Sequence, residues 1–405
     1  MGTEENQSND YYVDGKYFHT GIDEDVQDDP ILTNEYLNKG EKTQEKDPYE
    51  NHPWLFDKSK IIMASVVSEI MAGRADNKEA QSCGLNISEI SPVLEKVNIQ
   101  IEQEYRKFLQ KAKISDNISQ TDKDALINPE NVSVKMTPLI ENIRIFIARY
   151  LVQICGGNAE KLNKISDVEK NVGRILEEGF NRYFKIYEVD IPLYDKVYEE
   201  FDNLREDENY PLEVYLGRDG VYAFLGRRAK DIAKMRKLGP EKRKKMKEAG
   251  EIFEIHPKYI TYPRYFGTNI DREIRKEYLL QEGITKQANP IFYDTGFEGT
   301  IPNEIMFLMG FPSEESNKSI KMLSAKYPVH RIKGIPEDKR GDILDYIEEN
   351  AKLEESAEGF VHNEKTGKIR HIAKPTSPEE QFFFMMIKQA ITRHYWLQEH
   401  LRVEK

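Results

Sequence analysis

Apolar residues recur every three or four positions from Trp54 to about Glu206, the spacing that places them along one side of an α-helix. A Gly156-Gly157 pair interrupts the pattern and is typical of a helix end. Such stripes usually form helix cores, so we assign no chemistry to them. We therefore expect a helical region over residues 51–206 that covers the part of the chain after it.

After Pro211 the pattern changes to short apolar runs that alternate with helical segments. This alternation predicts parallel strands joined by crossover helices. We expect an α/β domain over residues 207–335, with a mostly parallel, Rossmann-like sheet. The predicted strands are 212–216, 259–262, 291–293, 321–324 and 329–332.

The last 70 or so residues carry three further signals. A helix is expected over 337–353, and the Asn363–Gly367 stretch predicts the turn of a hairpin within 360–373. Ser377 followed by Pro378 is typical of a helix start, and this helix should run to about His400. We expect residues 336–405 to pack on the α/β domain.

Charge is unevenly distributed along the chain, whose formal net charge is −12. Residues 1–58 hold 15 acidic and 5 basic side chains, so we expect residues 1–50 to be a disordered acidic tail. Its tyrosines leave open a docking segment for a protein partner. Residues 226–250 hold 11 Lys and Arg against 3 acids. That run could contact nucleic acid, although a solvated helix is the favoured interpretation.

Other features of the sequence argue against a membrane protein, a secreted protein and several common classes of enzyme. Apolar runs are too short for a membrane span, and the acidic first residues do not resemble a signal peptide. Cys83 and Cys155 give neither a disulfide framework nor a metal-ligand spacing. We expect a cytoplasmic protein. The sequence contains no P-loop, His-Glu-x-x-His or Gly-x-Ser-x-Gly motif.

The strongest candidate site follows the predicted strand 291–293. It reads Asp294-Thr295-Gly296-Phe297-Glu298-Gly299-Thr300 and leads into a helix. Glycines let backbone N–H groups approach an anion, and a helix N-terminus favours one. Asp294, at the carboxyl end of its strand, could hold Mg²⁺ or sugar hydroxyls. The alternative is an ordinary strand-to-helix turn capped by Thr300.

Two more strand ends carry polar residues. The first is Gly217-Arg218-Asp219-Gly220, which follows strand 212–216. The Arg218 guanidinium can bind a phosphate through two hydrogen bonds, and Gly220 allows the backbone to approach the ligand closely. Asp219 either acts in catalysis or caps the next helix. After strand 259–262, Tyr262 could stack on a base or sugar while Arg264 binds an anion, and the alternative is a loop whose aromatic side chains pack into the core. Arg227 and Arg228 either reach the same ligand or form a solvated helix face.

Over residues 212–303 the order of these elements resembles the type I phosphoribosyltransferase family. In that family an early Arg- and Gly-bearing loop holds pyrophosphate. A later strand that ends in acids leads into the loop that holds the 5′-phosphate of phosphoribosyl pyrophosphate. Arg218 and Gly220 match the first loop, and Asp294, Gly299 and Thr300 match the second. The same segments also look like parts of predicted haloacid-dehalogenase-type proteins.

The resemblance implies a transferase that acts on a nucleotide or phosphosugar with Mg²⁺. In that interpretation Asp294, Arg218 and Asp219 are catalytic, and Asp294 is the metal ligand. Two alternatives stay open: a non-catalytic nucleotide sensor with the same fold, and a protein-interaction role for the acidic tail.

Overall fold

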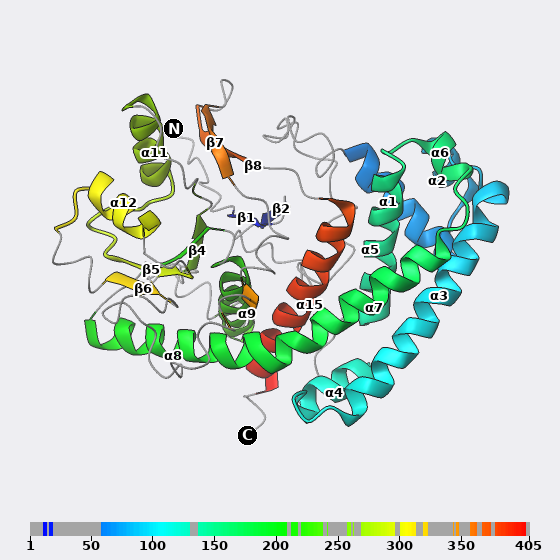
Figure 1. Ribbon diagram of the computed structural model, residues 1–405, viewed down its shortest axis with the longest axis horizontal. Helices are drawn as coiled ribbons and strands as arrows, with labels where there is room; N and C mark the ends of the chain where they lie inside the picture. The colour runs from blue at the N-terminus through cyan, green and yellow to red at the C-terminus, as the bar shows by residue number, and fades with distance from the viewer. Residues whose placement is uncertain are drawn as a thin grey trace. The chain divides into compact units, whose positions relative to one another are not determined.

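The computed structural model divides the chain into two compact units, Met1–Phe180 and Asn181–Lys405 (Figure 1). It describes residues 11–13, 16–18, 58–129, 137–208, 212–217, 220–237, 241, 257–260, 262, 269–295, 300–312, 319–322, 343, 346–347, 357–362, 367–373 and 377–401.

The Met1–Phe180 unit is helical in the places where the apolar stripes predict helices. Helices α1, α3 and α5 pack against one another, and their apolar side chains are buried, among them Val67, Ile101 and Ile147 at 0% exposure. Asp76, Asn86, Ser119 and Asn158 cap helix N-termini with their side chains. The helices are α1 (Lys58–Met71), α2 (Asn77–Ser82), α3 (Ile87–Ile114), α4 (Gln120–Ile127), α5 (Leu139–Ile154), α6 (Ala159–Asn163) and α7 (Glu169–Lys185), which continues into the second unit.

Two short strands fall within the segment expected to be a disordered tail. β1 (Tyr11–Val13) pairs antiparallel with β2 (Lys16–Phe18), and the other residues of 1–50 lie outside the described part of the chain. None of the helices that the structure describes has both the length and the apolar character needed to cross a bilayer.

The Asn181–Lys405 unit contains a four-stranded sheet whose described strands are all parallel, so the predicted α/β class is confirmed. The strands are β3 (Leu212–Leu216), β4 (Pro257–Ile260), β5 (Pro290–Asp294) and β6 (Ile320–Met322), and their order across the sheet is β4-β3-β5-β6. β4 begins and ends two residues earlier than its predicted range of 259–262, so Tyr262 lies beyond the strand.

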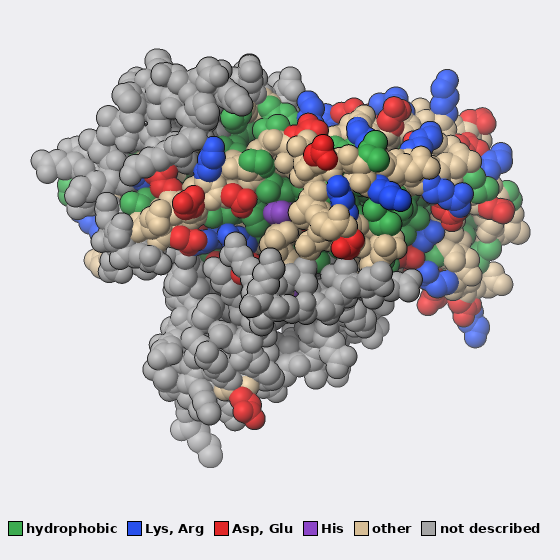
Figure 2. Space-filling view, turned by 90° about the horizontal axis from the view of Figure 1, so that it is seen from below, with side chains coloured by type: hydrophobic (Ala, Val, Ile, Leu, Met, Phe, Trp, Pro, Cys, Tyr) green, Lys and Arg blue, Asp and Glu red, His purple; other side chains and the backbone are tan. Residues whose placement is uncertain are grey.

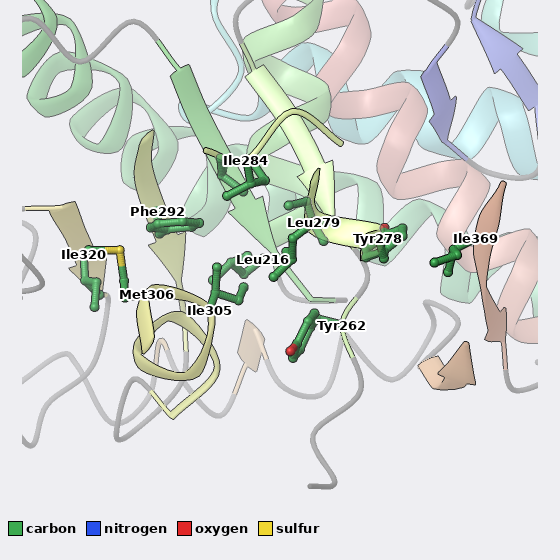
Figure 3. Close-up of a cluster of buried hydrophobic side chains, with 12 residues drawn as sticks. Leu216, Tyr262, Tyr278, Leu279, Ile284, Phe292, Ile305, Met306, Ile320 and Ile369 are labelled. Carbon is green, nitrogen blue, oxygen red and sulfur yellow. The ribbon is translucent and has the colours of Figure 1, made fainter. Parts of the chain in front are cut away.

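One face of the sheet packs on α11 (Asn269–Gln281) and α12 (Thr300–Leu308). Strand side chains alternate between the two faces, and Val214, Leu216 and Phe292 point to this one. They meet Leu279 of α11 and Ile305 of α12, all at 0–1% exposure (Figure 3). Burial of these apolar side chains is the main force that holds the two helices on the sheet.

The opposite face packs on α8 (Ile191–Glu208) and α9 (Val221–Lys237). Here the side chains of alternate strand positions are aromatic: the ring centroid of Phe201 in α8 lies 5.8 Å from that of Tyr215 and 6.3 Å from that of Tyr293. Phe224 of α9 lies 6.1 Å from Tyr215. Because its two faces are covered, the sheet is buried on both sides, as parallel sheets usually are.

The C-terminal elements agree with the hairpin and the helix start expected from the sequence. β7 (Ala357–His362) pairs antiparallel with β8 (Ile369–Ala373). The hairpin is tied to α11 through Gln281, whose Nε2 donates to the Ile369 carbonyl at 2.9 Å and whose Oε1 accepts from the Ile369 N–H at 2.7 Å. Helix α15 (Pro378–Leu401) packs along α9.

Gly226→Ala is expected to destabilise the Asn181–Lys405 unit by about 1–3 kcal/mol, because α9 has no room for an added methyl group. A Cβ at Gly226 would lie 2.6 Å from Cε2 of Tyr395 in α15 and would overlap the Tyr198 hydroxyl of α8. Both rings are buried, at 2% and 1% exposure. The midpoint of urea denaturation measures the loss.

Gly173→Ala in α7 is the matched control. A Cβ there meets the end of the Gln100 side chain, 2.8 Å from its Nε2, and a flexible side chain can turn away. Alanine favours a helix over glycine by up to about 1 kcal/mol, so this variant should be as stable as the wild type or more so. Equal losses from the two substitutions would contradict the packing explanation.

Candidate functional site

The order of the strands creates a switch point between β3 and β5. From β3 the chain crosses to β4 on one side, and it later returns to β5 on the other side of β3. The helices that follow the two central strands lie on opposite faces, α9 against Tyr215 and α12 against Phe292. In open α/β sheets ligands bind in the crevice at the carboxyl ends of such strands. The two glycine-bearing loops both start at this edge.

Asp294 and Thr295 mark the carboxyl end of β5. Asp294 is the last residue of the strand and is 7% exposed, and Thr295 is 2% exposed. Since Phe292 packs against α11 and α12 and Tyr293 contacts Phe201 on the other face, alternation places Asp294 on the α11/α12 side. Thr300 is the first residue of α12 and is exposed.

The carboxyl end of β3 is shaped by two glycines. Gly217 has a φ of +62° and donates its N–H to the Ile260 carbonyl at 3.0 Å, which links β3 to β4 at this edge. A Cβ on Gly220 would lie 3.2 Å from the backbone carbon of Tyr215. A side chain at position 220 would therefore be crowded against the backbone of β3, which is a packing reason for glycine there that is independent of any contact with phosphate.

The remaining predicted site residues cannot be placed. Arg218, Asp219, Arg264, Gly296 and Gly299 lie outside the described residues, and their assignment to the site rests on the sequence.

Tyr262 belongs to a polar cluster that the sequence analysis missed, the "Tyr262 cluster" of Tyr262, Arg275 and Glu304. Arg275 of α11 pairs with Glu304 of α12, with 3.1 Å between Nη1 and Oε1. The Arg275 guanidinium carbon lies 5.2 Å from the centroid of the Tyr262 ring. Burial raises the pKa of the Glu304 carboxyl, and the charge of Arg275 opposes that rise.

The sequence does contain a pattern that could have indicated this cluster: each of its two helices carries a charged residue among the apolar residues that face the core. Glu304 lies three residues after Ile301 and four before Leu308, and Arg275 lies three and four residues before Tyr278 and Leu279, which is the spacing of a shared helix face. A charged residue on a buried stripe usually has a partner, but the sequence does not show which one.

Arg227 is a structural residue of the opposite face and not the solvated or ligand-binding residue expected from the sequence. Its side chain is 0% exposed, and its Nη2 lies 2.9 Å from Oε1 of Glu213 in β3, itself 0% exposed. The same nitrogen lies 2.5 Å from Oδ1 of Asp202 in α8. The pairing fixes α9 against β3 and α8, the elements that flank the first loop.

Part of the basic stretch 226–250 is buried. Arg227, Arg228 and Lys230 are 0%, 1% and 8% exposed, so these three side chains are not available to a nucleic acid backbone. Residues 238–240 and 242–250 lie outside the described part of the chain. On the face that Figure 2 shows, acidic and basic side chains of the described residues are interspersed.

The described part of the chain contains no group of three or more His, Cys, Asp or Glu side chains that could together hold a metal ion. Mg²⁺ often uses only one or two protein carboxylates, with phosphates and waters completing its coordination, so a single carboxylate at Asp294 fits this ion.

No protein-family model, curated protein or solved structure matches the chain. The function has to be inferred from the position of the site in the fold and from the chemistry of its residues.

Proposed function

We propose that this protein is a transferase that binds a phosphorylated ligand, a nucleotide or phosphosugar, where β3 and β5 end, and that it acts in the manner of a phosphoribosyltransferase. One observation carries the proposal: the two loops picked out by the sequence start from adjacent strands, at the switch point of a parallel sheet. A ligand there would meet both loops and two helix N-termini at once.

The phosphate would be held by the loop that precedes α12. Thr295, Gly296, Gly299 and Thr300 supply backbone N–H groups and hydroxyls, and α12 begins at Thr300. An N–H-rich loop at a helix start favours an anion through both hydrogen bonds and the helix dipole. The exposed position of Thr300 suits this role.

Asp294 would orient the sugar or hold Mg²⁺. As the last residue of a central strand it has a fixed backbone, so its carboxylate is preorganised at the ligand edge. Mg²⁺, when bound, would neutralise charge on the phosphate oxygens. Arg218, Asp219 and Gly220 on the neighbouring loop would hold the leaving pyrophosphate or a second phosphate, with Arg264 and Tyr262 beside them. Such a reaction depends on charge stabilisation more than on a general base.

A thermal-shift panel tests the proposal. The ligands are phosphoribosyl pyrophosphate, nucleoside mono- to triphosphates, pyrophosphate and sugar phosphates, each with Mg²⁺. A ligand at 100 times its Kd should stabilise the fold by about 2.7 kcal/mol. We expect one phosphorylated ligand to raise the Tm of the wild type and not that of Asp294→Asn.

Asp116→Asn is the matched control, because Asp116 is exposed in the Met1–Phe180 unit, and it should respond like the wild type. Equal responses from Asp294→Asn and the wild type, or no response to any ligand, would contradict the proposed site. If the ligand is phosphoribosyl pyrophosphate, its pyrophosphate leaves when an acceptor nucleophile attacks the ribose carbon, so pyrophosphate release in the presence of a panel of nucleobase acceptors separates a transferase from a sensor, which binds without turnover.

A further inference from the structure

The run of helix from α7 to α8 is interrupted by a five-residue π-helical turn, η3 (Ile186–Asp190). A π turn breaks the regular pattern of α-helical hydrogen bonds, and such turns are frequent at functional positions. The residue that ends this turn is Asp190, whose side chain is only 2% exposed. A buried carboxyl group therefore lies in an irregular turn, where the chain enters α8.

Two tyrosine hydroxyls hold the Asp190 carboxyl. Its Oδ1 accepts from the Tyr194 hydroxyl of α8 at 3.2 Å, and its Oδ2 accepts from the Tyr346 hydroxyl at 2.8 Å. Tyr194 is 0% exposed, whereas Tyr346 is half-buried and lies 156 residues from Asp190 in the sequence. These three residues, the "Asp190 cluster", therefore join the turn to a distant part of the chain that is partly open to solvent.

The charged and titratable groups around the Asp190 cluster come from several elements. At the end of α7, Lys185 has its Nζ 5.4 Å from the centroid of the Tyr346 ring. From α15, the His394 ring packs edge-on against Tyr187 of η3, with 5.7 Å between the two centroids. The other titratable neighbours in the described part of the chain are Asp195 and Tyr198 of α8, Tyr293 of β5 and Tyr395 of α15.

The described neighbours do not balance a negative charge on Asp190. Burial and hydrogen bonds are what shift the pKa of this carboxyl. Burial outweighs the two tyrosine hydrogen bonds and raises the pKa to about 7, whereas an exposed aspartate has a pKa near 3.9. The neutral carboxyl fits the cluster, because a tyrosine hydroxyl can donate to it or accept from it. The carboxylate needs water, so loss of the proton favours a state in which water reaches Asp190.

We propose that the Asp190 cluster is a pH-sensitive switch: the protonated carboxyl closes the η3 turn, and loss of its proton to water releases Tyr346 and opens the turn. Tyr346 is the partner that moves, because it is half-buried, whereas Tyr194 is fully buried on the adjoining helix. Opening loosens the start of α8, the helix whose Phe201 packs on the central strands. The switch does not depend on the ligand proposed above.

Hydrogen exchange followed by mass spectrometry tests the switch on the full chain at pH 5, 6 and 7. Each exchange rate is divided into the rate of an unstructured peptide at the same pH, which gives a protection factor. In the wild type we expect the protection of residues 186–194 to fall roughly 50-fold from pH 5 to pH 7, because opening exposes the carboxyl and releases its proton. These residues should also be less protected than β5 at each pH, since the turn opens without unfolding the sheet.

Three variants assign the pH effect to the cluster. Asp190→Asn should make the protection of residues 186–194 independent of pH, because an amide does not titrate in this range. Tyr346→Phe should lower that protection roughly 2- to 10-fold at pH 5, since it removes one of the hydrogen bonds that close the turn. His394→Gln is the control for the other titratable side chain at η3, because histidine commonly changes charge in this range, and it should keep the 50-fold change.

Wild-type protection of residues 186–194 that does not change with pH would overturn the proposal, and this outcome requires no variant. A pH effect that persists in Asp190→Asn, or that His394→Gln abolishes, would overturn it as well. Equal protection of residues 186–194 and of β5 at every pH would mean that the turn opens only when the whole unit unfolds, which also contradicts a switch. Unchanged protection in Tyr346→Phe would show that this tyrosine does not close the turn.

Discussion

Arg227→Met is expected to lower the free energy of unfolding of the Asn181–Lys405 unit by about 3–5 kcal/mol, because it leaves a buried carboxylate without its cation. Glu213 and Arg227 are both 0% exposed and lie 2.9 Å apart. The other oxygen of Glu213 accepts a hydrogen bond from the Tyr215 hydroxyl at 2.9 Å, and this neutral donor cannot balance the charge. Urea denaturation followed by tyrosine fluorescence measures the loss.

A double variant and a surface variant test whether the loss in Arg227→Met comes from the unpaired buried charge. Arg227→Met combined with Glu213→Gln removes both charges, so it should recover a large part of the loss. Arg74→Met breaks an exposed pair with Glu69, whose atoms lie 2.8 Å apart at 50% and 29% exposure, and it should cost at most about 1 kcal/mol. A loss below 1 kcal/mol for Arg227→Met would show that the buried pair does not stabilise the unit.

Asp190→Asn is expected to stabilise the protein above pH 7 and to leave it unchanged near pH 4. Asp190 ends a five-residue π-helical turn, η3 (Ile186–Asp190), and is 2% exposed. Its Oδ1 accepts from the Tyr194 hydroxyl at 3.2 Å and its Oδ2 accepts from the Tyr346 hydroxyl at 2.8 Å. Burial nevertheless raises the pKa of this carboxyl to about 7.

The direction of the pH effect follows from proton binding. The unfolded chain has an aspartate pKa near 3.9, so between about pH 4 and pH 7 the folded state binds more protons than the unfolded state. Stability is therefore full below pH 4 and is lost as the pH rises toward 7. Each pKa unit corresponds to about 1.4 kcal/mol, which limits the gain from Asp190→Asn to about 4 kcal/mol above pH 7.

Urea denaturation of the wild type and of Asp190→Asn at intervals from pH 4 to pH 8 measures this gap. The difference between the two proteins removes the contribution of groups that titrate in both. Asp116→Asn, at an exposed position, should differ from the wild type by an amount that does not change with pH. A gap between Asp190→Asn and the wild type that stays constant over the range would contradict the raised pKa.

The sequence by itself determined the local elements. Apolar spacing predicted the helices of the first unit, because a helix that packs on one side needs an apolar stripe there. Ser377 predicted the start of α15: its hydroxyl accepts from the Glu380 N–H at 3.1 Å and Glu380 accepts from the Ser377 N–H at 2.7 Å. The alternation of strands and helices predicted a parallel sheet. Each of these signals lies within a few residues of the element that it predicts.

Only the tertiary structure decided which elements meet. The order β4-β3-β5-β6 places Leu212–Leu216 beside Pro290–Asp294. The residues of neither segment indicate which strand pairs with it. The same holds for Arg227 with Glu213 and for Arg275 with Glu304, pairs that are 14 and 29 residues apart in sequence. A buried charge requires a partner, but its identity depends on strand order and helix position, which follow from packing across the whole unit.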